Sequence, residues 1–217
     1  MRKFFEKIVE GGLLISGGVT SFTILLIVFF LFKEASGLFN SPVVEEGYVL
    51  AVNKSNDVSH LSPETIMDIF DAKITNWKEV GGPDAKIIVY SRETSSGTYE
   101  FFKESVLENK NYTNNILSMP ATGAIIQSIR QTKGAIGYVG MAYLNPHVKA
   151  IKVSYDGGKS YAYPSIENAR AKKYPIVRPL YYYYNKKDKN KVQPYLQFIT
   201  SERAENISLK LGFIPAM

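Results

Sequence analysis

The sequence of 217 residues contains no cysteine, and this absence excludes several kinds of site at once. A disulfide framework, a thiolate zinc site, an iron–sulfur cluster and a cysteine nucleophile all need the missing thiol. Histidine is scarce as well, because His60 and His147 are the only two in the chain. We therefore expect no metal site and no bound cofactor.

No block of one charge sign dominates the chain, although its net charge is +6. The lysines are scattered, and their densest run, residues 186–191, has the composition of a solvated loop. Because the lysines do not alternate with stacking aromatic side chains on one element, we do not expect nucleic acid as a partner. The positive charge suits a small anionic ligand better.

One long apolar run is present near the N-terminus. Residues 11–32 form 22 consecutive positions without a charge, and such a helix would be about 33 Å long, which matches a hydrocarbon core of ~30 Å. A cleaved signal peptide would have a shorter apolar region. Arg2, Lys3 and Lys7 precede the run, so the positive-inside bias predicts a cytoplasmic N-terminus.

The expected organisation follows from this run. We expect a cytoplasmic tail over 1–10, a single transmembrane helix over 11–33 and a linker over 34–46. A domain over 47–217 would then lie on the extracytoplasmic side of the cytoplasmic membrane.

Within that domain, stretches typical of strands alternate with stretches typical of helices. Ser62 is a favourable helix cap and Pro63 suits a first helical position. The expected strands cover 48–52, 86–90, 135–139 and 180–184, with a hairpin from 148–153 to 159–163, and the expected helices cover 62–70, 97–106, 123–131, 192–200 and 201–211. The alternation indicates an α/β domain.

The loop between strand 86–90 and helix 97–106 combines features that bind anions. Ser95, Ser96 and Thr98 offer hydroxyl groups, and Gly97 has no side chain to block a ligand. Arg92 supplies a planar fork of donors, and a helix N-terminus adds unpaired N–H groups at its positive end. We expect a site for a phosphate-like anion here. The plainer alternative is that Ser95 or Ser96 only caps the helix.

Several motifs of this sequence resemble, in the same order, the phosphate-binding protein of bacterial ABC phosphate importers. They are DIFDAKITNW (68–77), RETSSGT (92–98), GAIGYVGMAYL (134–144), RPLYYYYNK (178–186) and KLGFIPAM (210–217). The resemblance implies a type II periplasmic-binding-protein-like fold and importer permease subunits as partners. It also implies that Arg92, Ser96, Gly97 and Thr98 bind inorganic phosphate.

The sequence departs from that family in three respects. Ser95 stands where the family has glycine, and Thr94 where it has an acid, so Glu93 is the candidate to replace that acid. The family's segment before the strand at 48, with a second phosphate loop and an aspartate acceptor, has no counterpart here. The resemblance thus implies one complete lobe and part of the other. Residues 1–40 resemble instead the first membrane helix of the importer's permease subunit.

These features predict one function and leave two alternatives. The expected function is a membrane-anchored component that binds phosphate for an ABC importer and catalyses no reaction. The first alternative is a non-binding scaffold or permease-associated subunit with an incomplete cleft. An enzyme is the second, but a serine hydrolase would need Ser95 or Ser96 activated by a histidine, and neither serine lies in a G-x-S-x-G motif.

Overall fold

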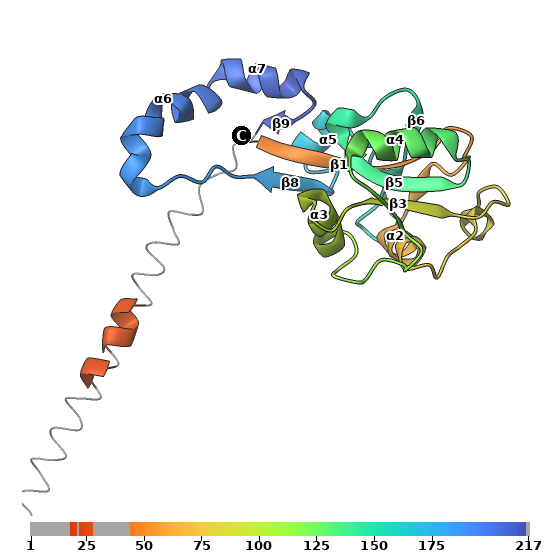
Figure 1. Cartoon of the computed structure of the whole chain (residues 1–217), viewed down its shortest axis with the longest axis horizontal. Helices are drawn as coiled ribbons and strands as arrows, with labels where there is room; N and C mark the ends of the chain where they lie inside the picture. The colour runs from red at the N-terminus through yellow and green to blue at the C-terminus, as the bar shows by residue number, and fades with distance from the viewer. Residues whose placement is uncertain (1–17, 21, 28–43, 216–217) are drawn as a thin grey trace, which may run out of the picture. The chain divides into compact units, whose positions relative to one another are not determined.

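The computed structural model describes residues 18–20, 22–27 and 44–215. The chain divides into two compact units, Met1–Ser41 and Pro42–Met217, and the second is an α/β domain (Figure 1). The described residues of the first unit are helical, and the described part of the chain has no helix long and apolar enough to cross a membrane. The predicted tail 1–10 and most of the predicted membrane helix 11–33 lie outside the described residues.

A seven-stranded sheet is built around one long strand, β1 (Val44–Asn53). The order is β4-β3-β5-β1-β6, and β8 and β9 also pair with β1. The other strands are β3 (Ile88–Arg92), β4 (Leu117–Met119), β5 (Ala135–Gly140), β6 (Val148–Ala150), β8 (Val177–Leu180) and β9 (Ile214–Pro215). Strands β4 and β5 run parallel to β3, whereas every partner of β1 is antiparallel to it. A small parallel pair joins β2 (His60–Leu61) to β7 (Lys152–Val153).

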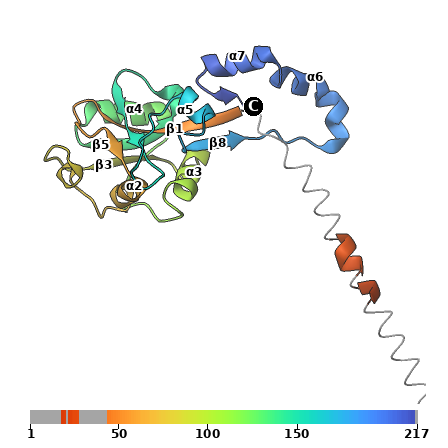
Figure 2. The same ribbon diagram turned by 180° about the vertical axis from the view of Figure 1, so that it is seen from behind.

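Helices cover both faces of this sheet. They are α2 (Pro63–Phe70), α3 (Gly97–Ser105), α4 (Thr122–Gln131), α5 (Ile166–Arg170), α6 (Lys189–Ile199) and α7 (Glu202–Lys210), with single 3-10 turns at Trp77–Val80, Met141–Tyr143 and Lys186–Asp188. Both ribbon views place α4 on one face, with α2 and α3 on the other (Figures 1 and 2). Helices α6 and α7 extend away from these layers.

The alternation of side chains along β1 creates two hydrophobic cores. Tyr48, Leu50 and Val52 point to the core beneath α2 and α3, whereas Val49 and Ala51 point to the core beneath α4. All five are almost completely buried, and burying one large apolar side chain contributes about 1.5–3 kcal/mol. The strand expected at 48–52 is confirmed, and the structure shows in addition that it lies between the two cores.

Aromatic packing holds α3 against the sheet. Tyr138 of β5 lies face to face with Phe102 of α3, with ring centroids 3.9 Å apart and planes 6° from parallel. The buried Tyr138 hydroxyl is 2.6 Å from Ser91 Oγ and 3.1 Å from the Tyr112 hydroxyl. Since this network links β5 to the end of β3, it fixes the strand from which the loop before α3 emerges.

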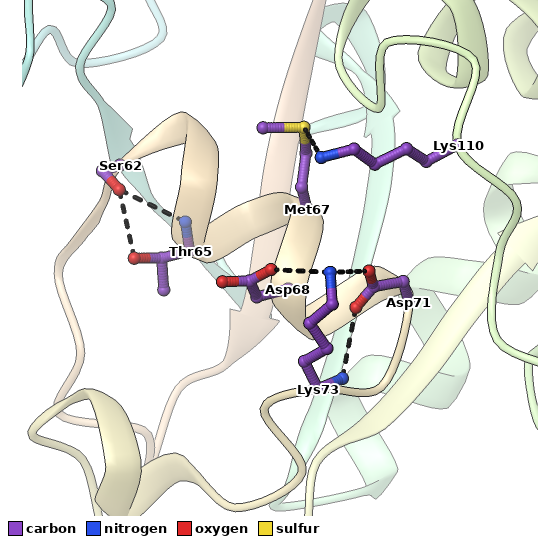
Figure 3. Close-up of polar contacts among 7 residues, drawn as sticks. All are labelled: Ser62, Thr65, Met67, Asp68, Asp71, Lys73 and Lys110. Atoms are coloured by element: carbon purple, nitrogen blue, oxygen red, sulfur yellow. Dashed lines mark hydrogen bonds and ion pairs between the residues drawn. The ribbon is translucent and has the colours of Figure 1, made fainter.

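Local polar contacts define the ends of α2 (Figure 3). Ser62 Oγ accepts a hydrogen bond from the backbone N–H of Thr65 at 3.2 Å, which confirms the predicted cap. After the helix, Lys73 Nζ lies 2.6 Å from Asp71 and 3.4 Å from Asp68. Because the Lys73 side chain is 64% exposed, these ion pairs contribute little to stability.

The predicted strand at 180–184 is wrong. The observed strand β8 ends at Leu180, which pairs with Val44 at the start of β1. The aromatic residues at 181–184 favour a strand locally, but within the described residues β1 offers them no partner before Val44. The register with β1, and not the aromatic run, therefore decides where this strand ends.

Three other predictions need correction. The strand expected at 86–90 is observed two residues later, at Ile88–Arg92, where β4 and β5 provide partners. The expected hairpin is reduced to a single bridge between Val153 and Ala162, because the chain leaves β1 after residue 151 and pairs with β2 instead. Strand β1 also begins at Val44, inside the segment predicted as a linker.

The buried hydroxyl network gives a test of the fold. Tyr138→Phe keeps the ring on Phe102 but leaves the Ser91 and Tyr112 hydroxyls without this partner. We expect the free energy of unfolding to fall by about 1–3 kcal/mol, as measured by urea titration. Tyr183→Phe is the matched control, because Tyr183 is 71% exposed; equal effects from the two changes would contradict a structural role for the network.

Candidate functional site

The loop between β3 and α3 places Ser96 at the cap of the helix. Ser96 Oγ accepts a hydrogen bond from the N–H of Thr98 at 3.2 Å, and the Ser96 carbonyl accepts the helical bond from Glu100 at 3.1 Å. Ser96 therefore caps α3, as one of the two serines was expected to do. The hydroxyl accepts in this bond, so its own hydrogen remains available for an acceptor outside the helix.

The neighbours of Ser96 are open to solvent. Ser95 and Gly97 are exposed and Thr98 is half-buried. Ser95 Oγ lies 3.4 Å from a carboxylate oxygen of Glu93, a long hydrogen bond on the surface. The structure therefore gathers the four predicted residues 95–98 around one helix N-terminus, where the first N–H groups have no partner within the helix.

Arg92, the fifth predicted residue, contacts a different element. Its Nη1 donates to Thr122 Oγ1 at 3.2 Å, and its Nη2 donates to the Pro120 carbonyl at 3.1 Å, both at the start of α4. Its Nε is buried and has no hydrogen-bond partner. Glu93, the candidate to replace the family's acid, is exposed, and its carboxylate accepts a hydrogen bond from Ser95.

Three residues that the sequence analysis did not select lie at the same helix end. An ideal Cβ on Gly97 would be 3.0 and 3.1 Å from Nη1 and Nη2 of Arg178, so the guanidinium of β8 lies directly against Gly97. The Tyr48 hydroxyl donates to a Glu46 carboxylate oxygen at 2.5 Å. Burial and then Glu46 raise the pKa of Tyr48 to about 12, while hydrogen bonding with Arg178 and Thr98 opposes that rise.

The signals for these three residues were weak in the sequence. Tyr48 reads as one more apolar residue of a buried strand, and Glu46 falls in the predicted linker. Arg178 precedes the predicted strand, although it belongs to the stretch 178–186 that resembles the family. Pairing of β8 with β1 places Arg178 opposite Glu46, and only this register brings them to the loop.

The two histidines make their contacts away from Ser95 and Ser96. His60 Nδ1 is 3.2 Å from Ser59 Oγ, and its ring contacts Tyr161 edge to face at a centroid distance of 4.5 Å. His147 is exposed, and its backbone N–H donates to Asn145. Neither histidine has a recorded hydrogen bond to Ser95 or Ser96. Among the described residues, no cluster of acidic or histidine side chains could hold a metal ion.

A profile of the PBP superfamily domain matches residues 30–203. The chain belongs to the PBP superfamily. Its relatives include the phosphate-binding protein PstS of Pseudomonas aeruginosa, at 28% identity over 190 residues, covering 80% of this chain and 59% of the relative. PstS of Staphylococcus saprophyticus is 30% identical over 181 residues, covering 79% and 56%, respectively.

Solved structures of the PBP superfamily agree with the observed fold. A phosphate ABC transporter substrate-binding protein from Clostridium perfringens, described as putative and with bound phosphate, matches with a TM-score of 0.70 and 34% identity. The match covers 81% of this chain and 71% of that one. A phosphate transport receptor from Vibrio cholerae gives a TM-score of 0.68 at 27% identity, covering 80% and 70%, respectively. The predicted α/β periplasmic-binding-protein-like fold is therefore confirmed.

The matches do not extend to every feature expected of the chain. It spans less than 60% of the length of the two PstS relatives. The matches also give no support to the predicted likeness of residues 1–40 to a permease helix.

The cap contact predicts a difference between two adjacent serines. Ser96→Ala removes the acceptor for the Thr98 N–H, and we expect it to lower the free energy of unfolding by about 1 kcal/mol. Ser95→Ala should change it by less than about 0.5 kcal/mol, because Ser95 is exposed and its contact is long. Urea unfolding of both variants measures the difference, and an equal loss would show that Ser96 is not the dominant cap.

Proposed function

We propose that this chain binds inorganic phosphate as the substrate-binding component of an ABC phosphate importer. The observation that carries the proposal is the Ser96-Gly97-Thr98 segment at the start of α3, directly after a parallel strand of a PBP-type sheet. Relatives named as phosphate-binding proteins, and a neighbour solved with bound phosphate, support phosphate as the anion.

Donors at the loop suit a tetrahedral oxyanion. The free N–H groups at the start of α3 and the hydroxyls of Ser95, Ser96 and Thr98 would donate to phosphate oxygens. Gly97 has no side chain to cover the backbone N–H groups, and the Arg178 guanidinium lies on the side where a Cβ would be. Arg92 would add a charge-assisted fork if an anion replaced its present acceptors, Thr122 and the Pro120 carbonyl.

In this proposal the chain binds its ligand without transforming it. A serine becomes a nucleophile only when a base takes its proton, and the nearest recorded partner of Ser95 is the exposed carboxylate of Glu93 at 3.4 Å. The relatives named above are binding proteins, which supports the same conclusion.

We further propose that residues 11–33 anchor the chain in the cytoplasmic membrane, with the N-terminus inside and the domain outside. The uncharged run and its basic flank support this. A tether would keep bound phosphate near importer permease subunits by raising its effective concentration. Protease added to spheroplasts should digest the domain of the membrane-bound chain. Recovery of a soluble chain trimmed at its N-terminus would contradict the anchor.

A second candidate function is a non-binding scaffold or permease-associated subunit. It is favoured by an apolar groove of about 330 Å³ beside β8, α6 and α7, to which Leu180, Tyr181 and Phe198 contribute. Tyr181 and Phe198 are 44% and 43% exposed, a large apolar surface for contact with another polypeptide. Phosphate titration separates the two functions, because only the first requires saturable binding by this chain alone.

Substitution of Arg92 tests the binding function. Arg92→Ala removes a charge-assisted donor, and we expect phosphate affinity to fall by roughly tenfold to a hundredfold in calorimetric titration. Thr98→Val should cost less, because it removes a neutral hydroxyl. Arg203→Ala is the matched control, since Arg203 is exposed on α7. Small and equal losses from all three would indicate attraction by the net positive charge without a defined site.

A further inference from the structure

We propose that Arg178 is a further phosphate-binding residue of this site, and that Tyr48 and Glu46 position it. The inference rests on the proposed function. It adds a donor from β8 to the loop, on the side of Gly97 where the guanidinium lies. Its basis is the meeting of three distant segments, β1, α3 and β8, at one helix end.

The position of the guanidinium is the first step. Arg178 Nη1 and Nη2 lie 3.0 and 3.1 Å from the point where a Cβ of residue 97 would be. A larger residue at the first position of α3 would push the guanidinium aside by a few tenths of an ångström, whereas glycine lets it lie beside the helix N–H groups that would bind an anion. The register of β8 on β1, with Arg178 opposite Glu46, fixes the backbone from which the side chain extends.

Charge is the second step. A helix N-terminus carries partial positive charge, so a guanidinium beside it is unfavourable unless an anion lies nearby. Among the described residues, Arg178 has no carboxylate within ion-pair distance, although its strand partner is Glu46. The Glu46 carboxylate accepts from the Tyr48 hydroxyl instead, at 2.5 Å. The first turn of α3 carries the exposed Glu100, but the described residues show no ion pair between Glu100 and Arg178. The guanidinium and the helix N-terminus are therefore suited to bind one anion together.

The support for Arg178 is the third step. Tyr48 is 1% exposed, and its ring packs on Phe101 of α3 with centroids 5.0 Å apart. Its hydroxyl donates to Glu46, and the side chains of Arg178 and Thr98 both oppose the rise in the pKa of Tyr48. A rigid buried phenol between the loop and β8 would therefore hold the guanidinium close to Thr98, a residue of the proposed site.

The experiment compares Arg178→Gln with Arg203→Gln in the full chain, by calorimetric titration with inorganic phosphate. We expect Arg178→Gln to weaken binding by roughly tenfold to a hundredfold and Arg203→Gln by less than twofold. Arg178→Lys should lie between them, because it keeps the charge and loses the planar fork. Urea unfolding without phosphate then shows whether a loss of affinity reflects a loss of structure.

The outcomes separate this inference from the proposed function. If the unsubstituted chain does not bind phosphate, the proposed function fails. If it binds, and Arg178→Gln and Arg203→Gln bind equally well, only the role of Arg178 is overturned. If Arg178→Gln gives no cooperative unfolding transition, Arg178→Lys decides: a loss of more than about threefold with unchanged stability supports the inference, and a smaller change overturns it.

Discussion

The burial of β1 is the constraint on which the rest of the domain depends. Its seven residues from Gly47 to Asn53 are all buried, and buried backbone N–H and C=O groups need hydrogen-bond partners. Strand β5 supplies hydrogen-bond partners along one edge of β1. Strand β6 and the segment before β8 supply partners at other positions of β1. The Tyr48 N–H, for example, donates to the Ile176 carbonyl at 2.9 Å. Because these partners come from residues 136 to 215, one strand ties the C-terminal part of the chain to the beginning of the domain.

Elements whose structure is decided locally were predictable from the sequence. The buried run at 48–52 and the Ser62 cap were found because hydrophobic character and capping chemistry are properties of consecutive residues. The end of β8 was not predictable, since the four adjacent tyrosines at 181–184 have strand propensity but find no partner strand among the described residues. The hairpin at 148–163 failed for a related reason: pairing with β2 competes with pairing across the turn, and the sequence around Asp156 contains no information about β2.

The residues of the candidate site also divide into those placed by the local sequence and those placed by strand pairing. Ser95 to Thr98 are consecutive, so their grouping at one helix end followed from the motif alone. Arg178 reaches that helix end only through its register with β1, which no local pattern reveals. The direction in which the Arg92 side chain points could not be predicted from neighbouring residues either. Its hydrogen-bond acceptors, Pro120 and Thr122, are about thirty residues away in the chain. A contiguous motif thus predicts where a site begins, and the topology decides which distant side chains belong to it.

In the proposed site, folding and ligand binding would share groups at the loop before α3. Ser96 Oγ accepts from the Thr98 N–H to stabilise the helix, yet its own hydrogen can still be donated to an oxyanion. The surrounding groups are nearly all donors: helix N–H groups, hydroxyls and the guanidinium of Arg178. Two carboxylates near the loop already accept hydrogen bonds: Glu46 accepts from Tyr48 at 2.5 Å, and Glu93 accepts from Ser95 at 3.4 Å. In the proposed function, this cluster of donors would surround a bound anion and share its negative charge among several hydrogen bonds.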